Sequence, residues 1–206
     1  DNDHAGRAFQ DALVRARGRG VEVRVLIDDV GARYTRPTMI RVLRAAGVPV
    51  AAFLPTRIPR LFRYANLRNH RKILVVDGRV GFTGGINVRA GHWLSRRPAR
   101  PVRCLHFRVD GPVVADMQRA FAIDWAFSTG ERLGGERWFS PTQGCGPVAA
   151  RGVPDGPDAD LDNLLQIIVG ALSVATRRAR IVTPYFLPDS VLLRAVQVAA
   201  LRGVEV

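Results

Sequence analysis

Helical and extended patterns alternate through the first quarter of this chain. Residues 8–17 are helical in pattern, and the apolar run over 21–27 predicts a buried strand closed by Asp28 and Asp29. The same order follows once more, with a helix predicted over 37–46 and a strand over 48–54. Strands that alternate with helices favour a layered α/β sheet.

A hairpin is predicted in the next part of the chain. A short apolar run over 72–76 is followed by Asp77-Gly78, a strong signal for a hairpin turn, and by a returning strand over 80–83. A further strand is predicted over 105–109, where Gly111-Pro112 ends it, and a helix over 113–127.

The composition changes to Gly, Pro and polar residues after residue 127, which indicates a linker. Beyond it the patterns predict a helix over 160–176, a strand over 179–183 and a helix over 191–201. The expected organisation is a first lobe over 1–127, a linker over 128–158 and the start of a second lobe over 159–206. The apolar stretch at 164–175 is interrupted and short of the roughly 20 residues that a membrane span needs.

A pentapeptide occurs twice, as Arg19-Gly20-Val21-Glu22-Val23 and as Arg202-Gly203-Val204-Glu205-Val206, each time after an Ala-rich helix. This indicates an internal duplication, although such a helix–strand junction is common enough to recur by chance. If the duplication is real, we expect a two-lobed protein whose second lobe is truncated before its own copy of residues 69–78. The first lobe is also expected to lack its leading strand, because the chain enters a helix almost at once.

The chemistry is concentrated in residues 69–78, where His70 and Lys72 stand two apart at the mouth of a predicted strand. Residues two apart on a strand share a face, so both side chains point one way and Arg71 points elsewhere. A neutral imidazole is a nucleophile near physiological pH. The adjacent ammonium can neutralise a phosphoryl oxygen, and it also lowers the pKa of the imidazole.

The predicted phosphate site is completed by three residues that follow the hairpin: Gly84, Gly85 and Asn87. Gly84 and Gly85 lack side chains, so the backbone there can approach a substrate closely. Asn87 offers an amide donor to a phosphate oxygen.

This pattern resembles the His-x-Lys…Asp signature of the phospholipase D superfamily, the HKD motif, which continues to a Gly-Gly or Gly-Ser pair and an asparagine. Six positions agree at fixed spacing. Several other segments look like those of bacterial cardiolipin synthases, namely 26–31, 64–70, 111–113, 124–125 and 183–189.

The resemblance implies a layered sandwich, a mixed β-sheet flanked by helices, with an active site built from two HKD motifs. In that family one histidine forms a phosphohistidine, the other protonates the leaving alcohol, and neither metal nor cofactor is needed. The implied reaction is phosphatidyl transfer between phosphatidylglycerol molecules at the cytoplasmic side of the inner membrane. With one motif, this chain is expected to be inactive alone unless a second lobe or a homodimer partner supplies the other.

Asp77 is interpreted as structural despite belonging to the motif. It lies five residues after Lys72, so strand parity places it on the opposite face. It also begins an Asp-Gly turn, where its side chain can satisfy local backbone groups.

Cys104 departs from the family pattern, which has an acidic residue just before the strand leading to Gly-Pro. A carboxylate there orients the histidine, and a thiol does so poorly. His106 shares strand parity with Cys104 and either faces the site or packs in the fold. His92 either contacts a headgroup or is a loop residue. No His, Cys and Asp cluster has metal-ligand spacing.

The charge is strongly basic, with 31 Lys+Arg against 18 Asp+Glu and a net charge of +13. Such a surface attracts polyanions, both anionic lipids and nucleic acids. Two alternatives therefore stay open beside phosphatidyl transfer. One is a phosphodiesterase or nuclease of the same superfamily, and the other is a non-catalytic basic module that binds anionic membranes.

Overall fold

The computed structural model describes residues 1–55, 68–156, 162–183 and 186–206. The chain divides into two compact units, residues 1–152 and 153–206. Two of the segments that resemble cardiolipin synthases, 64–70 and 183–189, lie partly outside the described residues. So do the last residues of the predicted linker over 128–158 and the first residues of the helix predicted over 160–176.

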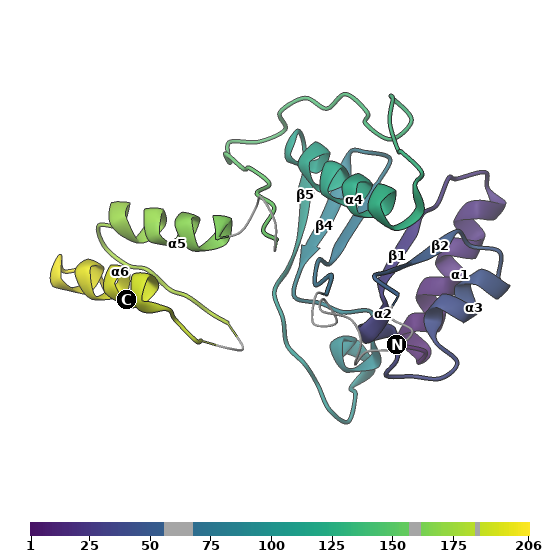
Figure 1. Cartoon of the computed structure of the whole chain (residues 1–206), viewed down its shortest axis with the longest axis horizontal. Coiled ribbons are helices and arrows are strands. Elements are labelled where there is room, and N and C mark those ends of the chain that lie inside the picture. The colour runs from purple at the N-terminus through teal and green to yellow at the C-terminus, as the bar shows by residue number, and fades with distance from the viewer. Residues whose placement is uncertain (56–67, 157–161, 184–185) are drawn as a thin grey trace. The chain divides into compact units, whose positions relative to one another are not determined.

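The first unit begins with a parallel pair of strands and the helices that cover it (Figure 1). Strand β1 (Val25–Asp28) lies beside β2 (Val50–Phe53). The helices are α1 (His4–Gly18), the short α2 (Asp29–Ala32) and α3 (Met39–Ala45). Their core is a cluster of buried apolar residues, Val23, Met39, Leu43 and Val48.

An antiparallel sheet of three strands follows, in the order β3 (Ile73–Val76), β4 (Val80–Gly84) and β5 (His106–Asp110). The turn between β3 and β4 places Asp77 at φ 55° and Gly78 at φ 65°, and Arg79 N donates to Val76 O over 3.1 Å. Positive φ at both central residues is what a type I′ hairpin turn requires. Two 3₁₀ turns, Ala90–His92 and Leu94–Arg96, lie between β4 and β5.

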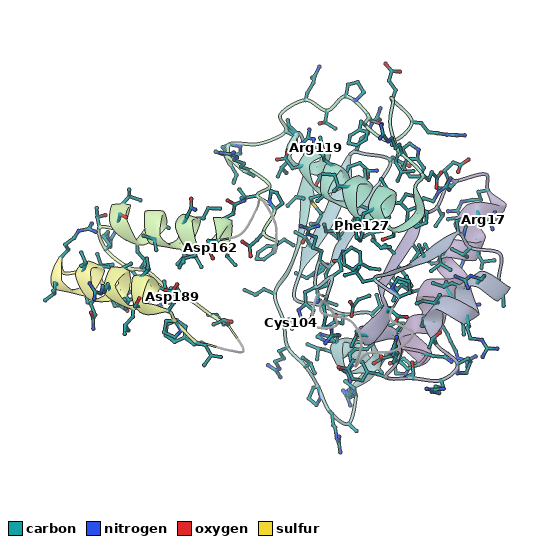
Figure 2. The ribbon with its side chains drawn as sticks, in the orientation of Figure 1. Arg17, Cys104, Arg119, Phe127, Asp162 and Asp189 are labelled. Carbon is teal, nitrogen blue, oxygen red and sulfur yellow. The ribbon has the colours of Figure 1, made fainter. Side chains whose placement is uncertain are left out.

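Helix α4 (Val113–Thr129) contacts strands of both sheets, β2 of the parallel pair and β3, β4 and β5 of the antiparallel sheet. Val114 is fully buried and Trp125 is 4% exposed. Phe127, labelled on α4 in Figure 2, meets Phe53 of β2 with ring centroids 5.7 Å apart. This one helix therefore holds the two sheets in a fixed relation.

Residues 130–152 pack back onto the first unit. Glu131 accepts hydrogen bonds from Arg24 and from the indole of Trp125, and the Arg24 bonds chiefly hold its pKa down at about 2. Gly152 N donates to Asp116 on α4 over 2.9 Å. Most of the predicted linker over 128–158 thus belongs to the first unit. The division of the chain into two phospholipase D-like lobes stays a prediction.

The second unit is a pair of helices, α5 (Asn163–Val174) and α6 (Ser190–Leu201), packed around Leu172, Ala199 and Val204. The strand predicted over 179–183 is wrong, because none of these residues forms a strand and only the preceding Arg178 forms a bridge, to Glu205. Without a neighbouring ladder, an apolar run lacks the hydrogen bonds that make a strand. Of the helices described, none combines the length and apolar character that crossing a bilayer takes.

The α/β class predicted from the sequence is confirmed, with its strands divided between a parallel pair and an antiparallel triplet flanked by helices. Element bounds differ by a few residues. Helix α1 begins at His4 rather than residue 8. Strand β1 begins at Val25 rather than residue 21, because Val21 and Val23 belong to the turn and core contact that follow α1.

Candidate active site

Asp28 organises the approach to the predicted catalytic segment. It ends β1, and its carboxylate caps α2 by accepting from Gly31 N over 2.8 Å. The same carboxylate accepts from Arg68 Nε and Nη2 over 3.2 and 3.1 Å, and from Asn69 N over 3.2 Å. The chain entering His70 is therefore attached to the end of the parallel sheet.

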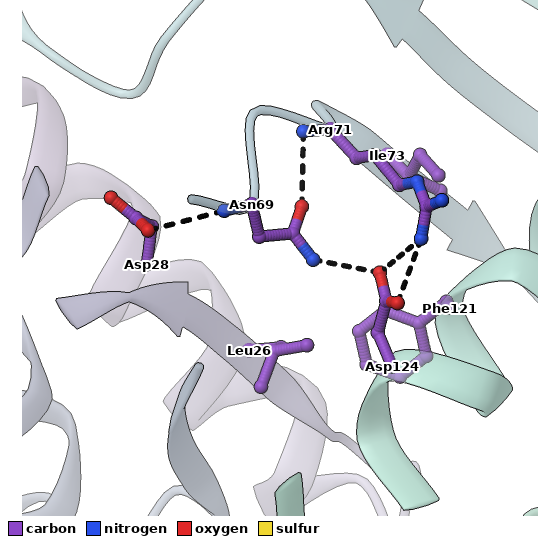
Figure 3. A pocket seen from close by; sticks show the side chains of 7 residues that line it. All are labelled: Leu26, Asp28, Asn69, Arg71, Ile73, Phe121 and Asp124. Atoms are coloured by element: carbon purple, nitrogen blue, oxygen red, sulfur yellow. Dashed lines mark hydrogen bonds and ion pairs between the residues drawn. The ribbon is translucent and has the colours of Figure 1, made fainter. Parts of the chain in front are cut away.

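The odd-numbered side chains of the segment face helix α4 (Figure 3). Asn69 Nδ2 donates to Asp124 over 2.7 Å, and Arg71 Nη1 lies 2.7 Å from both carboxylate oxygens of Asp124. Asn69 Oδ1 also accepts from Arg71 N over 3.0 Å. These groups line a small pocket of about 70 Å³ together with Leu26, Asp28, Ile73 and Phe121.

The even-numbered residues, His70 and Lys72, precede β3 rather than belonging to it. His70 is exposed, and its imidazole makes no hydrogen bond to any residue that the structure describes. Lys72 Nζ donates to His70 O over 2.8 Å, which keeps the ammonium beside the histidine. The predicted juxtaposition of an imidazole and an ammonium is present, although whether the pair is catalytic stays a prediction.

The charges around this pair favour the neutral form of the imidazole. The Lys72 ammonium is the main cause that lowers the pKa of His70, followed by partial burial and by Arg68, and Asp28 opposes the shift. The pKa of Lys72 is itself lowered, first by burial and then by Arg68. Asp28 and Cys104 oppose that second shift, so both lie within electrostatic range of the ammonium.

The glycine pair makes room for the chain that leads into β5. Gly84 has φ 144°, and a Cβ there would stand 2.5 Å from Leu105 O. A Cβ on Gly85 would stand 3.1 Å from Cys104 Cβ and 3.2 Å from its Sγ. The structure therefore explains both glycines by close packing of this protein's own backbone, and their contact with a phosphate stays a prediction.

Two further histidines border the same region. The Nδ1 atoms of His92 and His106 are buried and lack a hydrogen-bond partner within the described part of the chain. Burial lowers the pKa of His92, with further contributions from Arg89 and from Lys72. His106 lies opposite Gly84 in the β4–β5 register, with its Nδ1 3.0 Å from the place a Gly84 Cβ would take.

The remaining predicted residues lie apart from one another. Asn87 is exposed just after β4, and its carbonyl accepts from Arg89 N over 2.9 Å. Asp77 stands in the hairpin turn at the opposite end of β3 from His70. Among the described residues, no group of three His, Cys, Asp or Glu side chains is placed to hold a metal ion.

Comparison with known proteins places this arrangement in a family. Residues 5–125 match the family model described as "Cardiolipin synthase, PLD-like domain". The chain belongs to this phospholipase D-like family.

Curated relatives match the whole chain, beyond the residues that the family model covers. It is 36% identical to a cardiolipin synthase of Geobacillus kaustophilus, 34% to one of Alkalihalophilus pseudofirmus and 33% to one of Staphylococcus aureus. Each match covers 100% of this chain and 41–42% of the relative. The chain thus spans about two fifths of the length of these relatives.

Three residues with clear roles in holding the segment, Asp28, Arg68 and Asp124, were not predicted as site residues. Each stands in a stretch that resembles cardiolipin synthases (26–31, 64–70 and 124–125). That resemblance was the available signal. Their mutual contacts depend on the packing of β1 and α4 against residues 68–72, which no local pattern encodes.

Proposed function

We propose that this chain contributes His70 and Lys72 to a phosphatidyltransferase that makes cardiolipin. The observation that carries the proposal is an exposed imidazole, without a hydrogen bond to any described residue, whose pKa is lowered by an ammonium bonded to its own backbone carbonyl. A neutral imidazole beside a cation suits attack on a phosphodiester. Membership of the cardiolipin synthase family supports the lipid substrate.

The reaction proceeds in two steps, the formation of a phosphohistidine and its breakdown. An imidazole nitrogen attacks the phosphorus of phosphatidylglycerol, a phosphorus–nitrogen bond forms, and glycerol leaves with a proton from the second histidine of the pair. A hydroxyl of another phosphatidylglycerol then attacks the phosphohistidine, giving its proton back to that histidine and releasing cardiolipin. The phosphoryl oxygens are bound by Lys72, by Asn87 and by the backbone at Gly84 and Gly85. Asp77 has a structural role in the hairpin turn between β3 and β4.

The site needs a second histidine, which we place on a second phospholipase D-like lobe or on a second copy of this chain. His70 is then either the nucleophile or the acid. We further propose a peripheral position on the cytoplasmic face of a bacterial inner membrane. Cys104 brings no carboxylate to the imidazole, and Asp28 is the acid among the described residues whose charge raises the pKa of His70.

The test is an assay of the full-length protein on phosphatidylglycerol, with cardiolipin and glycerol measured by mass spectrometry. His70→Ala should lower turnover on the order of 10⁴-fold or more, as loss of a covalent or proton-transfer group does. His4→Ala is the matched control, because His4 is another exposed histidine and contacts Trp93 outside the site.

The alternatives give different results in the same assay. Cleavage of DNA without cardiolipin formation would assign the site to a nuclease, a function that the net charge of +13 also suits. If the His70→Ala variant still forms cardiolipin at the wild-type rate, the site around His70 does not take part in the reaction. Vesicle binding without any turnover would leave a non-catalytic membrane module.

A further inference from the structure

The segment between β4 and β5 has a composition unlike its surroundings. Residues 89–103 contain five arginines, Arg89, Arg96, Arg97, Arg100 and Arg103, and neither Asp nor Glu. A run of one sign over a short loop concentrates positive potential on one part of the surface.

The fold presents this segment as a closed loop. Val102 N donates to Gly91 O over 2.8 Å, and a Cβ on Gly91 would stand 3.0 Å from Arg100 O, so the two sides of the loop meet at its base. The 3₁₀ turns Ala90–His92 and Leu94–Arg96 shape the outgoing side. Figure 1 shows the connection from β4 to β5 as a long loop that extends beyond the ends of the strands.

Three of the arginines, Arg97, Arg100 and Arg103, are exposed and form no ion pair with a carboxylate in the described residues. The other two are engaged, since Arg89 pairs with Asp1 at 3.3 Å and Arg96 lies 5.1 Å over the Trp93 ring. Three uncompensated guanidinium groups on one loop are available to bind an external anion.

Apolar side chains are exposed on the same segment and where it enters β5. Leu94 is 44% exposed, Val102 40% and Leu105 72%. Trp93 already contacts His4, with ring centroids 5.7 Å apart, as well as Arg96. Arginines beside exposed aliphatic groups suit the headgroup region of a bilayer, whereas a single-stranded nucleic acid needs aromatic faces open for base stacking.

The loop also adjoins the candidate site at both ends. His92 on the outgoing side lies within electrostatic range of Lys72, and Cys104 on the returning side packs against Gly85. An anionic surface bound by the loop would therefore lie close to His70 and Lys72.

We propose that residues 89–103, together with Leu105 at the entry to β5, are the surface by which this protein docks on an anionic phospholipid bilayer. Arg97, Arg100 and Arg103 bind lipid phosphates, and Leu94 and Leu105 enter the headgroup region. The inference rests on the proposed function for its choice of lipid over other polyanions. Docking through this loop delivers a headgroup to the site without a membrane-spanning element in the described chain.

The test compares two variants of the 206-residue chain, each of which loses three positive charges. One is Arg97→Gln, Arg100→Gln and Arg103→Gln. The control is Arg15→Gln, Arg41→Gln and Arg44→Gln, because these arginines are exposed on α1 and α3 and belong to no ion pair among the described residues. Circular dichroism establishes that both variants fold like the wild type.

Binding is measured by cosedimentation with vesicles of phosphatidylcholine containing phosphatidylglycerol. Each arginine near an anionic surface contributes severalfold, so the loop variant should bind on the order of 100-fold more weakly, and the control should lose far less. Leu94→Ser with Leu105→Ser should weaken binding by a smaller factor. The wild type should not bind vesicles of phosphatidylcholine alone.

Equal losses in the loop variant and the control would overturn the proposal, because net charge alone would then explain binding. So would unchanged vesicle binding in the loop variant, or loss of DNA binding in that variant while vesicle binding persists. The readout involves no turnover, and His70→Ala should bind vesicles like the wild type. Failure of docking is thus distinguishable from failure of the proposed transferase activity.

Discussion

The two faces of residues 69–72 differ in how the fold uses them. On one face, Asn69 and Arg71 are bound to Asp124 of α4 through contacts of 2.7 Å. On the other face, His70 has an exposed imidazole without a hydrogen bond to a described residue, and Lys72 Nζ donates to the backbone carbonyl of His70.

This difference separates support from reactivity within four residues. The Asp124 face holds the segment in place, so it should contribute to the free energy of unfolding. The His70 face keeps its polar groups available, so it should contribute to chemistry and little to stability. Substitutions on the two faces should therefore have opposite effects on turnover and on unfolding.

Among the substitutions that compare the two faces, the largest expected effect comes from Lys72→Gln in the full-length protein. Loss of a cation that stabilises phosphoryl charge should lower cardiolipin formation by on the order of 10²–10³-fold. Arg71→Gln is the adjacent control and should retain most turnover while unfolding at a lower urea concentration. If both variants lost activity equally, the distinction between the two faces would be wrong.

A second effect should appear where β4 meets the segment leading into β5. Gly84→Ala places a Cβ 2.5 Å from Leu105 O at φ 144°, and should cost about 3 kcal/mol in free energy of unfolding. Gly130→Ala is the control, because its φ is 79° but nothing lies within 4 Å of the added carbon. It should cost about 1 kcal/mol. Urea denaturation of the 206-residue chain measures both, and equal costs would contradict the packing argument.

Removing the anchor on α4 should have a somewhat smaller effect on stability. Asp124→Ala leaves Asn69 and Arg71 without their shared acceptor and should lower the free energy of unfolding by about 2 kcal/mol. Asp124→Asn keeps an oxygen acceptor but loses the charge, so it should fall between the alanine variant and the wild type. A stability like that of the wild type in the alanine variant would show that the anchor is dispensable.

The smallest effect is a shift in the titration of His70. Because the folded-state pKa of His70 is lowered, chiefly by Lys72, its NMR titration midpoint should lie below 6.5 and the imidazole should stay neutral to lower pH. Lys72→Gln should raise the midpoint toward 6.5. Arg68→Gln should raise it less, because Arg68 has the smaller electrostatic effect on the pKa of His70. A midpoint insensitive to Lys72 would place the two side chains apart in solution.

Much of the candidate site follows from strand alternation and neighbouring charge. Alternation alone predicted that Arg71 would point away from His70 and Lys72, and Arg71 does bind Asp124. The depressed pKa of His70 follows from a cation two residues away. The roles of Asp28 and Asp124 could not be predicted this way, because they join segments 41 and 53 residues distant in sequence. The prediction of a strand over 179–183 was wrong for a related reason. Apolar residues indicate burial, but they do not provide the neighbouring strand with which a strand forms its hydrogen bonds.

The repeated pentapeptide separates what sequence determines from what packing decides. Both copies end a helix alike, with Gly20 at φ 84° and Gly203 at φ 86°, and with Val21 N and Val204 N each donating to the carbonyl five residues earlier over 3.1 Å. Glycine adopts that backbone at little cost, so the local sequence is sufficient.

The same valine then meets different surroundings in the two copies. Val21 is 43% exposed, and Val23, two residues on, is the one buried against Leu43 and Val48. Val204 is 5% exposed and packs on Leu172 and Ala199. Burial depends on which apolar side chains other segments bring to the site, and that is a property of tertiary structure. Sequence thus determined the helix ends, the hairpin turn and the His70–Lys72 pair, and packing decided what each of them contacts.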